Sequence, residues 1–178
     1  GGLRGIIQIK TFVTGPFQEN TYLIQAPDTG TAVCIDPGDD APILLEYIRS
    51  HQMNLKAIIN THGHIDHIGA AEHIQRELDI PFYIHEGDEY LVREIPRYCE
   101  LFGLTPVQSP QITRFIQPNE ELAFGEFIFK VLPSPGHTPG GVCFSTGDHL
   151  FVGDSLFKGS IGRTDLPGGD MATLLKSL

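Results

Sequence analysis

Three of the eight histidines of this chain lie in the stretch Thr61-His62-Gly63-His64-Ile65-Asp66-His67, together with an aspartate. The stretch comes directly after Leu55–Asn60, a short apolar run that predicts a buried strand. It comes directly before apolar residues that recur at helical spacing. Ligands of α/β sheets bind just outside the carboxyl ends of strands. The position of the stretch therefore predicts a site.

The spacing inside this stretch suits metal coordination. His62 and His64 are two residues apart, so their imidazoles point the same way in an extended loop, and Gly63 gives the backbone room to turn tightly. Asp66 and His67 follow where the chain bends and can face the same volume. Imidazole and carboxylate are ligands of Zn²⁺, and also of Fe or Mn. The alternative is a polar loop whose histidines cap the next helix, but three histidines with an aspartate favour a metal site.

Two further polar residues follow predicted strands. His137 stands in the rigid turn Pro135–Gly141, immediately after the predicted strand Phe127–Leu132. Asp154 follows the apolar run Leu150–Val152. Each alone would be an ordinary loop residue. Because a strand delivers each of them to its end, as it does the first cluster, we expect both to join that cluster.

The rest of the chain predicts an α/β fold. Strands fill the first third, strand–helix alternation follows, and strands then return. This order indicates two sheets with helices packed outside, an α/β sandwich. The predicted strands are Ile6–Thr14, Asn20–Gln25, Thr31–Ile35, Leu55–Asn60, Pro81–Ile84, Ile112–Ile116, Glu120–Phe124, Phe127–Leu132, Val142–Ser145 and Leu150–Val152. Four helices are predicted. The first follows the turn Asp36–Asp40 and has an apolar stripe of Ile43, Leu44, Tyr47 and Ile48. The others cover Ile65–Leu78, cover Glu86–Phe102 with a break at Pro96, and begin near Asp170.

Composition excludes several classes of protein. Lys and Arg number 12 against 22 Asp and Glu, a formal charge of −10, which argues against a nucleic-acid partner held by bulk electrostatics. No apolar run approaches the length of a membrane span, and no signal peptide is apparent. The scattered Cys34, Cys99 and Cys143 predict buried thiols in a reducing compartment. We therefore expect a cytoplasmic protein with one domain over residues 1–178.

The pattern His62-x-His64-x-Asp66-His67, with His137 and Asp154 downstream, resembles the metallo-β-lactamase superfamily over essentially the whole chain. Three other stretches resemble the small bacterial glyoxalase II-like branch of that superfamily, whose members are hydroxyacylglutathione hydrolase-like. These stretches are Gly15–Tyr22, Asp36-Pro37-Gly38 and Gly159–Asp170.

The resemblance implies an αββα sandwich with a two-metal site, expected to hold Zn²⁺, at one edge of the sheets. The implied ligands are His62, His64 and His137 for the first metal, Asp66 and His67 for the second, and Asp154 as the bridge. The family normally adds a second-metal His in a turn after the C-terminal helix, and the sequence stops at Leu178 before such a turn. The expectation is thus a fold whose C-terminal part is truncated, without the usual last strand and His, and whose second site is one ligand short.

Two metals about 3.5–4 Å apart bring the pKa of a shared water near neutrality and so create a hydroxide nucleophile, which Asp66 would orient. We expect a metal-dependent hydrolase of small-molecule thioesters such as hydroxyacylglutathione. A second hypothesis is a mononuclear Fe persulfide dioxygenase, with ligands from His62, His64 and the His137–Asp154 pair. A third is a metal-binding fragment without activity.

Arg163 lies where the resembled enzymes place a basic residue for a glutathione carboxylate, and Lys158 is a second substrate-binding candidate. The alternative for Arg163 is a surface ion pair with Asp165. Asp36 either hydrogen-bonds a metal-bound His or simply forms the Asp-Pro-Gly turn. The other histidines are predicted to be structural: His51, His73, His85 and His149.

Overall fold

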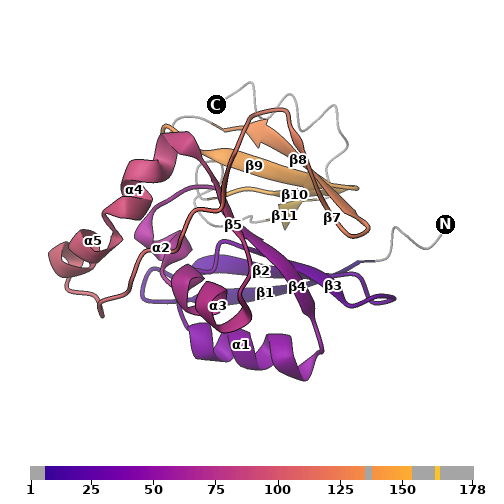
Figure 1. Cartoon of the computed structure of the whole chain (residues 1–178), viewed down its shortest axis with the longest axis horizontal. Helices are drawn as coiled ribbons and strands as arrows, with labels where there is room; N and C mark the ends of the chain where they lie inside the picture. Colours follow the sequence, from indigo (N-terminus) through magenta and orange to yellow (C-terminus); the bar gives the residue numbers. More distant parts are fainter. Residues whose placement is uncertain (1–6, 135–137, 154–162, 165–178) are drawn as a thin grey trace.

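The described strands form two sheets that face one another, with helices packed against the first of them (Figure 1). The structure is a computed structural model that describes residues 7–134 and 138–153 and the backbone of residues 163–164. The first sheet has the order β1-β2-β3-β4-β5-β6, and the second has the order β11-β10-β9-β8-β7. The predicted α/β sandwich is confirmed in these two sheets.

The first sheet begins as an antiparallel meander and continues as a parallel sheet. Strands β1 to β3 pair antiparallel, whereas β3 to β6 pair parallel. Parallel neighbours need a crossover connection, and the helices between these strands supply it. The strands are β1 (Gln8–Thr14), β2 (Glu19–Gln25), β3 (Thr31–Ile35), β4 (Asn54–Ile59), β5 (Phe82–His85) and β6 (Arg114–Ile116). The helices are α1 (Ala41–Ser50), α2 (Ile65–Ile68), α3 (Ala71–Leu78), α4 (Glu89–Arg93) and α5 (Ile95–Phe102).

The second sheet is antiparallel throughout. Alternate residues of β8 are buried, among them Phe127, Phe129 and Val131, as expected of a strand with one face toward a core. The strands are β7 (Glu121–Phe124), β8 (Phe127–Pro133), β9 (Val142–Thr146), β10 (His149–Phe151) and β11 (Arg163–Thr164). Strand β11 has no counterpart among the predicted elements.

Two apolar layers hold these parts together. Between the sheets, Ile35 and Ile59 of the first sheet pack with Phe129 and Phe144 of the second. On the other face of the first sheet, strand residues such as Ile58 pack with the helices. All of β3 and the residues Ala57–Ile59 of β4 are buried and mostly apolar, as is typical of parallel strands covered on both faces.

The helix predicted over Ile65–Leu78 is wrong as a single element. It divides into α2 and α3, with Gly69 and Ala70 between them. Ala70 donates its backbone N–H to Pro37 O at 3.0 Å. A Cβ at Gly69 would lie 2.5 Å from Gly38 O, so the chain is pressed against the loop after β3 at this point. This tertiary contact outweighs the helical spacing of the apolar residues.

Other local predictions also need correction. Ile43 was placed on the apolar stripe of α1 but is 56% exposed, and Leu45 is buried in its stead. The break in the third helix falls at Glu94, because Pro96 occupies the first turn of α5, where its missing N–H costs nothing. The helix predicted near Asp170 lies outside the described residues. In the described part of the chain, no helix is long and apolar enough to cross a membrane.

Candidate metal centre

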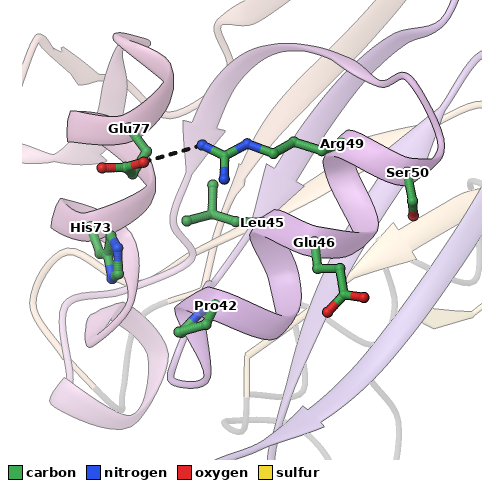
Figure 2. Close-up of a pocket in the computed structure, with 7 residues that line it drawn as sticks. All are labelled: Pro42, Leu45, Glu46, Arg49, Ser50, His73 and Glu77. Carbon is green, nitrogen blue, oxygen red and sulfur yellow. Dashed lines mark hydrogen bonds and ion pairs between the residues drawn. The ribbon is translucent and has the colours of Figure 1, made fainter.

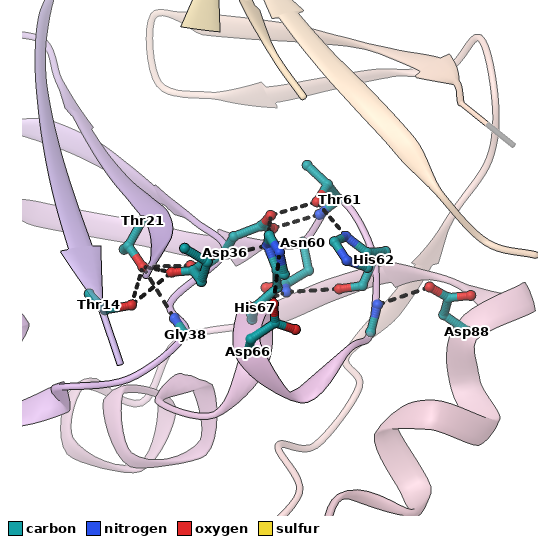
Figure 3. A network of polar contacts seen from close by, with 12 residues as sticks. Thr14, Thr21, Asp36, Gly38, Asn60, Thr61, His62, Asp66, His67 and Asp88 are labelled. Carbon is teal, nitrogen blue, oxygen red and sulfur yellow. Dashed lines mark hydrogen bonds and ion pairs between the residues drawn. The ribbon is translucent and has the colours of Figure 1, made fainter. Parts of the chain in front are cut away.

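The candidate site lies at the carboxyl ends of three neighbouring parallel strands. Asp36 comes directly after β3, and His62 is the third residue after the end of β4. Asp88 is the last residue of the 3₁₀ turn that follows β5. Asp36, His62 and Asp88 are all buried. Carboxyl ends of parallel strands meet at one edge of a sheet, which explains why residues far apart in the sequence share one site (Figure 3).

The histidine-rich stretch brings its imidazoles together. The rings of His62 and His67 are 4.1 Å apart between centroids, and those of His62 and His64 are 5.0 Å apart. Asp66 Oδ2 lies 3.5 Å from His67 Nε2. His64 is extended and precedes α2, whereas Asp66 and His67 are in that helix. The four residues of the stretch therefore face a common volume.

Asp36 supports this cluster through hydrogen bonds to Thr61 and His67. Its Oδ1 accepts the Thr61 backbone N–H at 2.7 Å, and its Oδ2 accepts the Thr61 hydroxyl at 2.5 Å and His67 Nδ1 at 2.9 Å. One ligand atom each of Asp36, His62 and His67 lies within 4.8 Å of the other two, so this group could hold a metal ion. Both oxygens of Asp36 are already engaged by protein donors. Asp36 is therefore better placed to hydrogen-bond a metal-binding histidine than to coordinate the metal itself.

These hydrogen bonds also fix the tautomers of two histidines. A carboxylate can only accept, so His67 carries a proton on Nδ1, and a neutral His67 has its lone pair on Nε2. The single proton of the Thr61 hydroxyl goes to Asp36, so Thr61 Oγ1 accepts from His62 Nδ1 at 3.0 Å. His62 is then also an Nδ1–H tautomer. Both rings thus have Nε2 as the nitrogen that is able to bind a metal.

Glu19 is a second buried carboxyl group beside His67. Its Oε1 lies 3.2 Å from His67 Nδ1, and its Oε2 accepts hydrogen bonds from the hydroxyls of Thr14 and Thr21 at 2.7 and 3.0 Å. Burial raises the pKa of Glu19 to about 8; His67 lowers it, Asp36 raises it and the two hydroxyls lower it. Burial of Glu19 thus favours its neutral form, which limits the negative charge around Asp36.

Asn60 ties the loop to the start of α2. Its side-chain Nδ2 donates to His62 O at 3.1 Å and to His67 O at 2.7 Å. Asn60 is completely buried, so these bonds are shielded from competing water. They fix the backbone at both ends of the stretch that carries the candidate ligands.

Asp88 joins the histidine loop to a second loop. Its Oδ2 accepts the Gly63 backbone N–H at 2.9 Å and the Thr138 hydroxyl at 2.7 Å, and its Oδ1 accepts the Gly140 N–H at 2.8 Å. A Cβ at Gly140 would lie 2.7 Å from Asp88 N, so only glycine allows this approach. One fully buried carboxylate thus sets the distance between the His62–His64 loop and the loop that follows His137.

We expect Asp88→Asn to weaken metal binding about 10- to 100-fold. The amide can accept on one side only, so the donor at Gly63, Thr138 or Gly140 loses its acceptor and the two loops separate. The Kd is measured by competition with a chromophoric chelator. Ser109→Ala, which removes the bond from Ser109 Oγ to Val92 O away from the site, is the control and should leave the Kd unchanged. Equal metal affinity in Asp88→Asn and wild type would contradict this role.

The remaining predicted site residues are only partly described. His137, Asp154 and Lys158 lie outside the described residues, as does the side chain of Arg163, whose backbone pairs with Phe151 in β10. Their described neighbours do border the site. Val142 N donates to Thr61 O at 2.9 Å, and a Cβ at Gly153 would lie 3.0 Å from the ring of His62.

None of the histidines predicted to be structural belongs to the group of Asp36, His62 and His67 that could hold a metal ion in the described chain. Figure 2 shows His73 and Glu77 on α3, at a surface cavity of about 600 Å³ between α3 and α1. Arg49 of α1 forms an ion pair with Glu77 at 3.1 Å beside this cavity. His51 stacks on Tyr47, and His85 Nδ1 accepts the Gly87 N–H. The three cysteines are buried, and burial raises the pKa of the Cys143 thiol to about 11.

The sequence pattern indicates the candidate metal-binding stretch but not all of the residues that support it. Asp36 was considered as a partner of a metal-bound histidine, and the structure shows its bond to His67. Glu19, Asn60 and Asp88 were not singled out. Asn60 carried a signal, because it ends the strand that delivers the histidines. Asp88 carried none, since it lies within a segment of helical pattern.

Two facing sheets carry imidazoles and carboxylates at the strand ends, and part of this group could hold a metal ion. A family model for the metallo-beta-lactamase superfamily matches residues 14–178. The chain belongs to the metallo-beta-lactamase superfamily.

Relatives and solved structures agree with this assignment. Hydroxyacylglutathione hydrolase GloC of Haemophilus influenzae is 39% identical over 176 residues, which cover 97% of this chain and 82% of that protein. The BLEG-1 B3 metallo-beta-lactamase matches with a TM-score of 0.77 at 36% identity, over 94% of this chain and 81% of that one. TTHA1623 in a di-iron-bound form matches with a TM-score of 0.75 at 36% identity, over 94% and 84%.

Proposed function

We propose that this chain is a metal-dependent hydrolase of thioesters of the hydroxyacylglutathione type. The observation that carries the proposal is the pair of buried imidazoles, His62 and His67, both held as Nδ1–H tautomers beside Asp66. The 39% identity to hydroxyacylglutathione hydrolase GloC supports the substrate class. We also propose that residues 1–178 form one domain and that the enzyme is cytoplasmic, in keeping with its buried free thiols.

The donor set fits a metal of the zinc, iron or manganese kind. It combines neutral imidazoles with carboxylates, which such ions accept, and a hydrogen bond at Nδ1 supports the ring of each buried histidine. We propose Zn²⁺ as the native metal. The proposed ligands are His62, His64, Asp66, His67, His137 and Asp154.

In the reaction, the oxygen of a water molecule bonds to the thioester carbonyl carbon and the C–S bond breaks, which yields an acid and a thiol. Bound metal ions would supply an activated water and polarise the carbonyl. Asp66, at the first turn of α2, is proposed to orient the attacking water. Asp36 keeps the proton of His67 on Nδ1, so Nε2 faces the site throughout. The hydrogen bonds of Asp88 and Asn60 hold the loop that carries His62 and His64 in place.

The test combines metal analysis with two assays on the metal-loaded protein. Release of free thiol from lactoylglutathione, with no oxygen uptake on glutathione persulfide, is the expected result. Oxygen uptake on the persulfide with one Fe bound and no thioester hydrolysis would instead identify a persulfide dioxygenase. Bound metal with neither activity would mean that the chain binds metal without catalysing either reaction.

We propose that Arg163, with Lys158 as the weaker candidate, binds a carboxylate of glutathione. Arg163→Ala should then raise KM about 10- to 100-fold, because a hydrogen bond to a charged group contributes roughly 1.5–3 kcal/mol. The kcat should change less, since the anchor binds ground and transition states alike. Steady-state kinetics on lactoylglutathione give both constants. An unchanged KM with unchanged metal content would assign Arg163 to a surface ion pair.

A further inference from the structure

A cavity of about 520 Å³ adjoins the candidate metal centre. One wall is the turn between β1 and β2, with Pro16 and Phe17. The opposite wall is the end of α5 and the segment that follows it, with Leu104 and Val107. Helix α2 lies between these walls and contributes Ile65 and Asp66; it contacts both β2 and α5. Figure 1 shows these elements at one end of the first sheet.

Asp66 connects this cavity to the histidines. The residue lines the cavity, and its Oδ2 lies 3.5 Å from His67 Nε2. Gly38 forms part of the lining, and a Cβ there would lie 2.1 Å from Asp66 O. The wall beside Asp66 is therefore rigid. Asp66 is thus the residue at which the cavity adjoins the candidate metal centre.

The residues that line the cavity indicate which part of a thioester substrate would fit in it. Phe17, Leu104 and Val107 offer apolar surface, and Phe17 is 52% exposed although its side chain is large. The charged residues that line it are Asp39 and Asp66, and neither a lysine nor an arginine of the described chain does so. The lining therefore offers no described cation to pair with the two carboxylates of glutathione. An uncharged, apolar group fits it.

We propose that this cavity receives the acyl group of the substrate, and that the enzyme prefers thioesters with extended apolar acyl chains over compact ones such as lactoyl. The proposal rests on the thioesterase function proposed above and names the substrate class of the same site. The glutathione part then points away from the cavity, toward the second sheet.

The test is a series of glutathione thioesters from propanoyl to octanoyl. Wild-type kcat/KM should rise about twofold to fourfold for each added methylene, the effect of burying that group. Phe17→Ala should flatten this dependence and Phe17→Leu should restore most of it. Val107→Thr, which keeps the shape but adds a hydroxyl, should also flatten it. Leu101→Ala is the control, because Leu101 is on α5 and 62% exposed but does not line the cavity.

A binding measurement separates failure of this inference from failure of the thioesterase function. S-Decylglutathione and S-methylglutathione cannot be hydrolysed, and calorimetry gives their Kd values. Tighter binding of the decyl compound by wild type, lost in Phe17→Ala, supports the cavity even if no thioester is turned over. Equal binding of the two compounds, or a flat kcat/KM series on an active enzyme, overturns the inference and leaves the thioesterase function standing.

Discussion

Replacement of His62 by alanine is expected to lower kcat/KM for thioester hydrolysis by about three orders of magnitude or more, because it removes the metal on which the reaction depends. His62 is 3% exposed, its Nδ1 is held by Thr61, and its ring is 4.1 Å from that of His67. Metal content should fall in parallel, as measured by elemental analysis of the purified variant.

His73→Ala is the matched control for this experiment. His73 lies on α3 at the surface cavity next to α1, and none of the candidate metal ligands of the described chain lines that cavity. The variant should keep both its metal and its activity. Loss of metal in His73→Ala, or full metal content in His62→Ala, would show that the metal binds elsewhere.

The second large effect is expected from Asp36→Asn, which keeps size and shape but removes one acceptor. If the amide oxygen faces the Thr61 N–H, its NH₂ faces His67 Nδ1, which must then accept. The His67 proton moves to Nε2, the nitrogen that faces Asp66, and blocks it as a ligand. If the amide is turned round, the NH₂ meets the Thr61 N–H, and a buried donor is left without an acceptor.

Either arrangement should weaken metal binding about 10- to 100-fold and lower the free energy of unfolding of the metal-free protein by roughly 1–3 kcal/mol. Chelator competition and urea denaturation measure the two quantities. Asp39→Asn is the control, since Asp39 is exposed in the same loop and its Oδ1 acceptor for Asp40 N is kept. Wild-type metal affinity in Asp36→Asn would mean that the tautomer of His67 does not matter for binding.

Much of the fold could be predicted because its strands are periodic and the turns between them carry Gly or Pro. The range Thr31–Ile35 agrees with β3 residue for residue, and Leu55–Asn60 differs from β4 by one residue at each end. The errors arose where tertiary contacts overrule local pattern. Gly69 and Ala70 interrupt a regular helical spacing because the loop at Pro37–Gly38 packs against them.

The candidate site was predictable only where its residues are close in sequence. His62, His64, Asp66 and His67 form a dense local pattern. Asp88 reaches the same site from the end of another strand, and the pairing of β4 with β5 that brings it there leaves no local mark in the sequence. Glu19 arrives in the same way through β2, which pairs with β3. Support around ligands is therefore a property of strand order, and a single sequence does not display it.

We propose that the cluster around His62 and His67 binds the metal on which hydrolysis depends. The most direct measurement is elemental analysis of protein that was supplemented with Zn²⁺ and then desalted, with wild type and His62→Ala treated side by side. We expect at least one tightly bound equivalent in the wild type and less than about a tenth of that in the variant. Equal metal content in the two proteins, or none in the wild type, would contradict it.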